Sequence, residues 1–410
     1  MKFRNTFNTL FFLLVLFGFG IVNLAFFQSG SVSSLEQRNL VRRPAFSLDR
    51  FISGEFPREF DDYFSDHFAF RTLMAKAGAY LMEFKGLPDK NEATILQQGG
   101  DNTSQNLKPG NGTGAAANTG QAVQYLIFKD RAYTLFKYSE PSAERYADAL
   151  NRFKSAVDPE IRVYSLLAPT SADFIEEEKY RELSYSQKAA FDHINESLNP
   201  EIKPIDAYGM LARHIDEELY FRTDHHWTAL GAYYAYVKLM DALGEEPVPL
   251  NSYLKGEIKE FLGSAYKATL SFRLRAHPDT IIYYEPAEKY TYTRYSTAGK
   301  EIEGGAVDPE YAKASGGLYS VFLGGDFPWG EIQTEHKNGR KILVVKDSYA
   351  NALIPFLIPH FENIYYIDPR FFSGSLTGFV KEHDISEVLF LNNSTVARSQ
   401  GIAELINKRM

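Results

Sequence analysis

The hydrophobic and polar positions divide the chain into segments with different patterns. Apolar residues fill positions 9–27 without a charge, and they return at helical spacing between 56 and 85. From 97 to 121 the chain consists mainly of Gly, Asn, Thr, Ala, Gln and Ser, a composition that buries too little apolar surface to order a segment. From 123 onward, strand-like and helix-like blocks alternate to the C-terminus. The pattern predicts a leading apolar segment, a helical stalk, a flexible loop and one large α/β domain.

These changes of pattern set the expected domain boundaries. We expect a cytoplasmic tip and transmembrane signal-anchor over 1–28, a stalk with N-terminal helices over 29–95, a flexible low-complexity loop over 96–122, and an α/β domain over 123–410. Within that domain, 251–335 differs in texture. Paired glycines mark turns there, and antiparallel strands are expected at 269–275 and 280–284. This segment is interpreted as a β-rich insertion.

The length of the apolar run at 9–27 bears on where the protein is located in the cell. Its length matches the ~20 residues that a helix needs to cross a bilayer, and it ends in a poor cleavage site. Lys2 and Arg4 precede it and favour a cytoplasmic N-terminus. We therefore expect a single-pass anchor that places the large domain on the extracytoplasmic side of the cell membrane. A cleaved signal peptide is the alternative, and it also exports the rest of the chain.

The α/β domain ends in three strongly apolar strands, expected at 341–346, 363–367 and 387–391. Each is followed at once by polar residues. Earlier in the domain, a helix over 142–157 precedes a strand over 162–168, and a helix over 186–198 follows. Such alternation is typical of a mainly parallel sheet covered by helices on both faces. Ligands bind at the carboxyl ends of the strands in such sheets, where these polar residues fall.

Composition excludes several classes of function. The formal net charge is −8 and no run of Lys or Arg is present, which argues against a nucleic-acid partner. The chain has no cysteine. A thiolate metal site, a cysteine nucleophile and disulfides are therefore excluded together.

A cluster of chemically active side chains stands at Asp224, His225, His226 and Trp227. A helical pattern follows from Thr228 to Leu243, so the cluster is expected on a loop at a helix entry. Two adjacent imidazoles are poor core residues because each needs a hydrogen-bond partner or water.

Ser348 is the candidate nucleophile, because it follows a predicted strand and precedes a helix. His226 or His225 is the candidate base, and Asp224 could orient that imidazole. The alternative for the serine is a helix N-cap. For the histidines the alternatives are a structural loop or a metal site that uses Asp224 as well. Adjacent residues rarely face one metal, so we expect neither a metal nor any other cofactor.

The motifs Asp224-His-His-Trp227, Val345-Lys-Asp-Ser-Tyr-Ala-Asn351 and Tyr365-Tyr-Ile-Asp-Pro-Arg370 together resemble the DHHW protein family. That family is similar to the SGNH-hydrolase-like domains of the alginate O-acetylation proteins AlgJ and AlgX. The resemblance implies an SGNH/GDSL-hydrolase-like fold with a permuted order of motifs.

Carried over by position, the resemblance makes Ser348 the nucleophile, His226 the base and Asp224 the orienting acid. His225 takes a secondary position beside them. The oxyanion donors correspond to Gly374 and to one of two asparagines, Asn392 or Asn393.

The resemblance also implies an activity and partners. The activity is O-acetyl transfer to an exported polysaccharide, or removal from it, through an acyl-serine. A membrane-bound O-acyltransferase would supply the acetyl group. Trp227 and Trp329 could offer stacking faces for sugar rings, with core packing as the alternative.

Two other functions compete with this interpretation. A non-catalytic glycan-binding or scaffold protein would keep the fold but hold the Ser348 hydroxyl more than roughly 5 Å from both imidazoles. A metal-dependent hydrolase would lose its activity on chelation.

Overall fold

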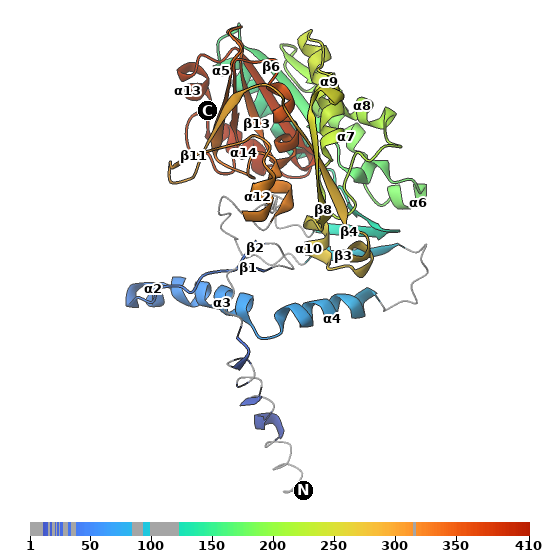
Figure 1. Ribbon diagram of the computed structural model, residues 1–410, viewed down its shortest axis with the longest axis vertical. Helices are drawn as coiled ribbons and strands as arrows, with labels where there is room; N and C mark the ends of the chain where they lie inside the picture. Colours follow the sequence, from blue (N-terminus) through green and yellow to red (C-terminus); the bar gives the residue numbers. More distant parts are fainter. Residues whose placement is uncertain are drawn as a thin grey trace. The chain divides into compact units, whose positions relative to one another are not determined.

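The computed structural model describes residues 38–83, 93–98, 123–314 and 317–410, with scattered residues before position 38 (Figure 1). The chain divides into two compact units, Met1–Leu87 and Pro88–Met410. The second unit starts before the boundary expected at 95–96, because a strand at 94–98 belongs to one of its sheets. The predicted loop over 96–122 lies almost entirely outside the described residues.

The first unit is helical in its described part. It contains α2 (Leu48–Ile52), α3 (Glu55–His67) and α4 (Arg71–Glu83), preceded by the two-residue strands β1 (Val32–Ser33) and β2 (Arg38–Asn39). Across the described residues, no helix combines the length and apolar character that crossing a membrane requires. The predicted anchor over 9–27 falls in part on positions outside that description.

The second unit is built on an eight-stranded sheet with the order β11-β10-β12-β14-β13-β15-β6-β7. Its strands are β6 (Arg162–Ala168), β7 (Ile202–Ile205), β10 (Tyr290–Tyr295), β11 (Glu301–Gly304), β12 (Trp329–Thr334), β13 (Lys341–Lys346), β14 (Asn363–Ile367) and β15 (Glu387–Asn393). Two smaller sheets accompany it. One joins β3 (Thr94–Gln98), β4 (Val123–Phe128) and β5 (Arg131–Thr134), and the other pairs β8 (Leu254–Phe261) with β9 (Asp279–Glu285).

The main sheet is mixed: it contains the expected parallel strands, and three antiparallel strands that were not expected in it extend one edge. Five strands, β14-β13-β15-β6-β7, run parallel, whereas β12, β10 and β11 extend the β14 edge in antiparallel fashion. Those three strands come from the segment interpreted as an insertion. The segment therefore completes the main sheet, and only the β8–β9 hairpin stands apart from it.

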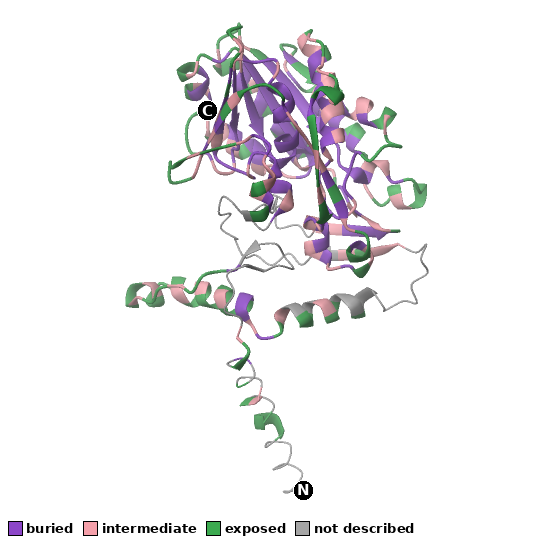
Figure 2. Ribbon diagram, in the orientation of Figure 1, coloured by how far each residue is buried: buried purple, intermediate pink, exposed green. Residues whose placement is uncertain are grey.

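Helices cover both faces of the sheet because every central strand is apolar on both sides. Alternate residues of β13 point to opposite faces, so Val344 belongs to one buried core and Val345 to the other. The first core includes α8 (Ala207–Arg213) and α9 (Ala229–Leu243). The second includes α5 (Glu140–Ala156), α7 (Gln187–Glu196), α13 (Leu376–Glu382) and α14 (Gly401–Lys408). Figure 2 shows the buried residues following the central strands.

One strand expected from the sequence is wrong. Positions 269–275 form the end of α10 (Ser264–Thr269) and most of α11 (Phe272–Ala276). Leu270 separates the two helices in the left-handed conformation, with φ 51°. Among the described residues of the second unit, the short helices α6 (Glu178–Arg181) and α12 (Pro309–Ala314) are the remaining α-helices.

Candidate active site

The Asp-His-His loop is fixed at both of its ends. Thr228 caps α9 by accepting a hydrogen bond from the backbone N–H of Gly231, and its own N–H donates to the carbonyl of Leu219 at 2.8 Å. At the other end, Asp279 of β9 accepts hydrogen bonds from the N–H and the hydroxyl of Thr223, at 2.8 and 2.6 Å. The residues between these two anchors are held rigidly against the sheet.

Asp224, His226 and Ser348 form a continuous hydrogen-bond chain. The carboxylate Oδ1 of Asp224 lies 2.6 Å from Nδ1 of His226, and Nε2 of the same ring lies 2.7 Å from the Ser348 hydroxyl oxygen. All three are buried, with exposed fractions of 4, 3 and 5%. The arrangement can pass the serine proton to the imidazole while the carboxylate fixes the ring.

Two residues that the sequence did not indicate complete the surroundings of Asp224. The N–H of Ser264 donates to Oδ2 of Asp224 at 2.7 Å, and Gly263 approaches so closely that a Cβ there would stand 2.4 Å from that oxygen. Burial alone would raise the pKa of Asp224, but His226, His225 and the Ser264 N–H together hold this pKa well below its usual value. Asp224 is therefore an anion.

The turn after β13 positions the serine. Asp347 caps the following 3₁₀ turn (Ser348–Ala352) through the N–H of Tyr349, and its second oxygen accepts the N–H of Asn393 at 2.7 Å. Burial raises the pKa of this carboxyl group. Because Asn393 is the last residue of β15, Asp347 ties the ends of two neighbouring strands together beside Ser348.

His225 lies against His226, with 3.9 Å between the ring centroids, but it is not part of the chain to Ser348. Its Nδ1 lies 2.5 Å from the hydroxyl oxygen of Ser264, and its carbonyl accepts a hydrogen bond from the Tyr349 hydroxyl. Burial and the neighbouring His226 lower the pKa of His225 to about 3. His225 is neutral at ordinary pH.

Tyr319 is a third residue that the sequence did not indicate. Its ring stacks on the His226 imidazole, with 4.1 Å between centroids and 10° between planes. Burial, and after it the charge of Asp224, raises the pKa of Tyr319 well above its usual value. The stacked ring limits rotation of the imidazole. No short motif surrounds Tyr319, so only the folded chain reveals this contact.

Both tryptophans differ from the expectation that they offer open faces to sugar rings. Trp227 is fully buried in the core and donates its indole N–H to the Tyr349 carbonyl at 2.9 Å. This finding corrects the prediction, because an enclosed indole cannot stack on a sugar. Trp329 is partly exposed, but Tyr295 stacks on it at 3.8 Å and 6° and Phe379 contacts it edge-on. Neither indole takes part in the hydrogen-bond chain of the serine.

The three residues expected as oxyanion donors have different surroundings in the structure. Asn392 accepts a hydrogen bond from the Tyr146 hydroxyl, and its Nδ2 is enclosed with no partner among the described residues. The Asn393 side chain caps the 3₁₀ turn Ser394–Ala397, so it is already engaged. Gly374 lies against the Phe372 ring, and no described interaction joins it to Ser348. The assignment of these three residues stays a prediction.

A buried cluster of four charged side chains borders the site. Lys346 of β13 lies 3.2 Å from Asp326 and 3.6 Å from Asp368, and Arg370 lies 2.9 Å from Asp326 and 2.5 Å from Asp368. Asn351, in the turn that Ser348 begins, donates to Asp326 at 3.0 Å. The cluster is formally neutral, and this pairing is what permits such burial.

Asp224, His225 and His226 also present ligand atoms within 4.8 Å of one another, as a metal site would require. In the structure, Asp224 Oδ1 and His226 Nδ1 are bonded to each other, and His225 Nδ1 faces the hydroxyl of Ser264. A metal ion would have to displace these hydrogen bonds, so the donor set fits a Ser-His-Asp chain better than a cation site.

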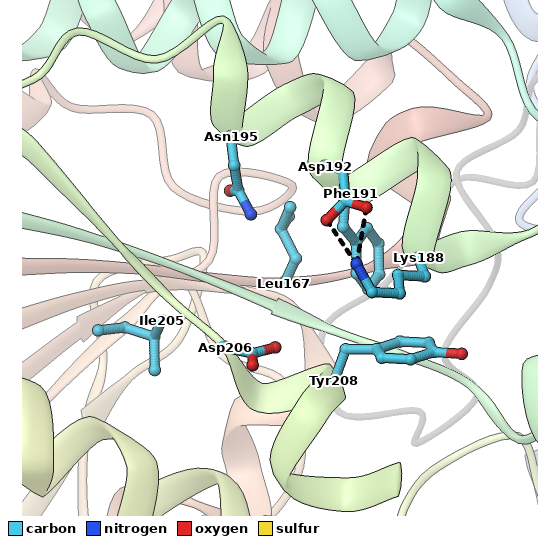
Figure 3. Close-up of a pocket in the computed structure, with 8 residues that line it drawn as sticks. All are labelled: Leu167, Lys188, Phe191, Asp192, Asn195, Ile205, Asp206 and Tyr208. Carbon is cyan, nitrogen blue, oxygen red and sulfur yellow. Dashed lines mark hydrogen bonds and ion pairs between the residues drawn. The ribbon is translucent and has the colours of Figure 1, made fainter.

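A small cavity lies elsewhere, between α7 and the junction of β7 with α8 (Figure 3). Its volume is about 30 Å³, enough for one water molecule. Figure 3 shows Lys188 paired with Asp192 at its rim and Asp206 at the start of α8. None of the three residues of the hydrogen-bond chain lines this cavity.

Comparisons with known proteins give a family and a fold. The profile of the DHHW protein family matches residues 90–367. The crystal structure of a DHHW family protein from Eubacterium siraeum is 32% identical, with a TM-score of 0.64, over 70% of this chain and 95% of that chain. No curated protein is significantly similar in sequence.

A more distant solved structure shares the fold. PatB1 of Bacillus cereus, solved with a sulfonyl adduct, is 18% identical, with a TM-score of 0.60 over 69% of this chain and 98% of that chain. The O-acetyltransferase domain of Pseudomonas putida AlgJ is 13% identical, with a TM-score of 0.38 over 68% of this chain and 97% of that chain.

Proposed function

Because the chain belongs to the DHHW protein family, we propose that it is an O-acetyltransferase or acetylesterase that acts on an exported polysaccharide. The supporting observation is the hydrogen-bond chain from Asp224 through His226 to Ser348. Ser348 attacks the acyl carbonyl while Nε2 of His226 takes its proton. A sugar hydroxyl or water then receives the acyl group from the serine, and His226 serves as the base again.

The distance between Ser348 and His226 favours catalysis over a scaffold role. A scaffold has no need to keep the serine within hydrogen-bond reach of an imidazole, and here the separation is 2.7 Å. A buried and ionised Asp224 adds the acid that holds the ring in one orientation. Removing the Asp224 carboxylate from the hydrogen-bond chain is expected to lower the rate of acylation strongly, because the His226 imidazole would adopt the wrong tautomer.

The proposal extends to the cellular location. We propose that residues 9–27 anchor the chain, that the α/β unit faces the extracytoplasmic side, and that a membrane-bound O-acyltransferase supplies the acetyl group. A reporter fused after residue 410 tests the orientation. An active periplasmic or extracellular reporter is expected, and a reporter that works only in the cytoplasm contradicts it.

The decisive experiment measures hydrolysis of a chromogenic acetyl ester by the purified protein. Ser348→Ala and His226→Ala are each expected to lower kcat by about 10⁴-fold or more, because nucleophile and base act as one unit. Ser394→Ala is the matched control. Ser394 is also buried and also begins a 3₁₀ turn after a strand of the same sheet.

Full activity in the Ser348→Ala variant would contradict the proposal. Acyl-serine formation, detected by intact mass, covers the case of a strict transferase that releases little product into water. Inactivation by a sulfonyl fluoride offers a second probe of the serine. A chelator distinguishes the serine mechanism from the metal-dependent alternative. An enzyme that uses the serine mechanism is expected to keep its rate in the presence of EDTA.

A further inference from the structure

The His226 imidazole has an aromatic ring over each of its two faces. Tyr319 stacks on it with 4.1 Å between centroids and 10° between planes, and the centroid of the His225 ring lies 3.9 Å away, with its plane tilted by 36°. Both distances are shorter than the ~4.5–7 Å at which aromatic rings usually meet, so each neighbour covers a face of the imidazole. Two rings over the same face would touch each other. In the part of the chain that the structure describes, no ring contact joins His225 to Tyr319, so they lie on opposite faces.

The Tyr319 ring is itself held in place. It belongs to a 3₁₀ turn over Leu318–Val321, and the carbonyl of the last residue in this turn accepts a hydrogen bond from the N–H of Asp308 at 2.9 Å. Phe322 contacts the ring edge-on with 5.2 Å between centroids, and Phe221 does the same with 6.2 Å and 90°. Because these neighbours are buried as well, the Tyr319 ring has little freedom to move away from the imidazole.

The hydrogen bonds that orient the imidazole do not all survive the proposed reaction. In the free protein Asp224 holds Nδ1 of His226 at 2.6 Å, and the Ser348 hydroxyl holds Nε2 at 2.7 Å. Once Ser348 carries an acyl group, its oxygen has no proton to share. Nε2 therefore loses this partner at the stage when it must accept a proton from water or from a sugar hydroxyl. The bond to Asp224 and the two covering rings then oppose rotation of the imidazole.

We propose that Tyr319 is a positioning residue for the second half of the reaction, because its ring keeps Nε2 of His226 directed at Ser348 while the serine carries the acyl group. This inference rests on the proposed function. In that half, the acceptor hydroxyl gives its proton to Nε2 and its oxygen forms a bond to the acyl carbon. The bond from that carbon to the serine oxygen then breaks, and the proton passes from Nε2 to the serine oxygen. Between the two transfers the imidazole is a cation, which the face of a neutral aromatic ring stabilises.

The test measures the two half-reactions of the full chain separately, with 4-nitrophenyl acetate as the acyl donor. The first release of nitrophenolate gives the rate of acylation. The acylated protein is then isolated, and loss of its acyl group to water or added methanol, followed by intact mass, gives the rate of deacylation. Tyr319→Leu is expected to slow deacylation by about 10-fold, which is part of the roughly 10²–10⁴-fold that a positioned base contributes. Acylation, in which the Ser348 hydroxyl still holds the imidazole, is expected to stay within about twofold of the wild-type rate.

Tyr319→Phe is the matched variant, because the Tyr319 hydroxyl is enclosed without a hydrogen-bond partner among the described residues. Phenylalanine keeps the flat ring, so wild-type rates are expected in both half-reactions. Phe153→Leu is the control for lost packing. Phe153 is fully buried in the core on the other face of the sheet, away from His226. This variant is expected to lose stability without a change in either rate.

Wild-type deacylation in Tyr319→Leu, or an equal loss of both rates, overturns the inference alone, since a purely structural role does not single out one half-reaction. Slow deacylation in Tyr319→Phe, or a wild-type acyl-serine that persists in methanol, overturns it as well. Tyr319→Met covers the case in which the leucine variant fails to fold. Methionine fills irregular space without a flat ring, so the same selective loss of deacylation is expected. A wild-type chain that is never acylated overturns the proposed function and this inference with it.

Discussion

At the scale of single residues, the site depends on contacts between positions far apart in sequence. Asp224 and His226 stand two residues apart, and their pairing could be predicted from the motif. The Ser264 N–H on the Asp224 carboxylate and the Tyr319 ring on His226 could not, because no local pattern encodes either contact. Trp227 shows the opposite error. An aromatic residue beside Asp224, His225 and His226 in the motif suggested ligand contact, whereas the indole fills the core.

The low pKa of His225 gives a testable pH dependence of stability. In the folded protein His225 stays neutral down to about pH 3, whereas in the unfolded chain an imidazole takes up a proton near pH ~6.5. Between these values the unfolded state binds one more proton. His225 therefore lowers the free energy of unfolding by about 1.4 kcal/mol for each unit that the pH falls.

His225→Gln removes this pH-dependent contribution to the free energy of unfolding. The stability of the variant should therefore fall less steeply with decreasing pH than that of the wild type. Urea unfolding between pH 4.5 and pH 6 measures the two slopes. Above about pH 7 they should coincide, since histidine is neutral in both states there. Parallel slopes throughout the acid range would contradict the low pKa of His225.

At the scale of elements, the strands with strong apolar runs could be predicted, whereas the elements of 251–335 could not all be predicted. β13, β14 and β15 were expected within two residues of their observed ends, because buried parallel strands read as unbroken apolar runs. Positions 269–275 alternate apolar and polar residues, yet they form two short helices. Over so few residues the period of apolar positions does not separate the two structures.

The start of α9 offers a prediction at the same scale. A Cβ on Gly231 would stand 2.5 Å from the carbonyl oxygen of Leu219, so Gly231→Ala must push the helix away from the loop that carries Asp224 and His226. We expect a loss of about 1–3 kcal/mol in the free energy of unfolding. Acylation of Ser348 should also be slower.

Gly244→Ala, at the other end of α9, separates these two effects. Gly244 ends the helix at φ +76° with open space around its Cβ position, so alanine there costs about 1–2 kcal/mol from the left-handed backbone alone. The Gly244 variant should acylate at the wild-type rate. If Gly231→Ala kept that rate as well, the contact with Leu219 would not position the site.

At the scale of the whole molecule, the family resemblance expected from three motifs is confirmed, and the composition of the sheet is corrected. Five parallel strands followed from alternating strands and helices. The antiparallel extension β12-β10-β11 did not, because the sequence of 251–335 shows strands and turns but not which sheet they join. Edge pairing is decided by packing across the fold, which a local pattern does not record.

The division into two units predicts that the second unit alone is sufficient for acylation of Ser348. Residues 88–410 contain both buried cores and all three members of the hydrogen-bond chain. A protein that starts at Pro88 is expected to unfold cooperatively and to form the acyl-serine at the full-length rate. Circular dichroism and intact mass provide the measurement. A cooperative unfolding transition without acylation would show that the first unit contributes to the site.

The strand order has a consequence for when the serine becomes reactive. Of these strands β15 comes last in the sequence, yet it lies between β13, which leads into the turn of Ser348, and β6. The bond from Arg162 to Glu387 that closes this junction spans 225 positions in sequence. Such distant contacts form late, because the entropy of closing a long loop must be overcome first. A chain that ends before β15 holds Asp224, His226 and Ser348 but lacks the strand that joins the two halves of the sheet. If the proposed function holds, acyl transfer is therefore expected to begin only when synthesis and folding are complete.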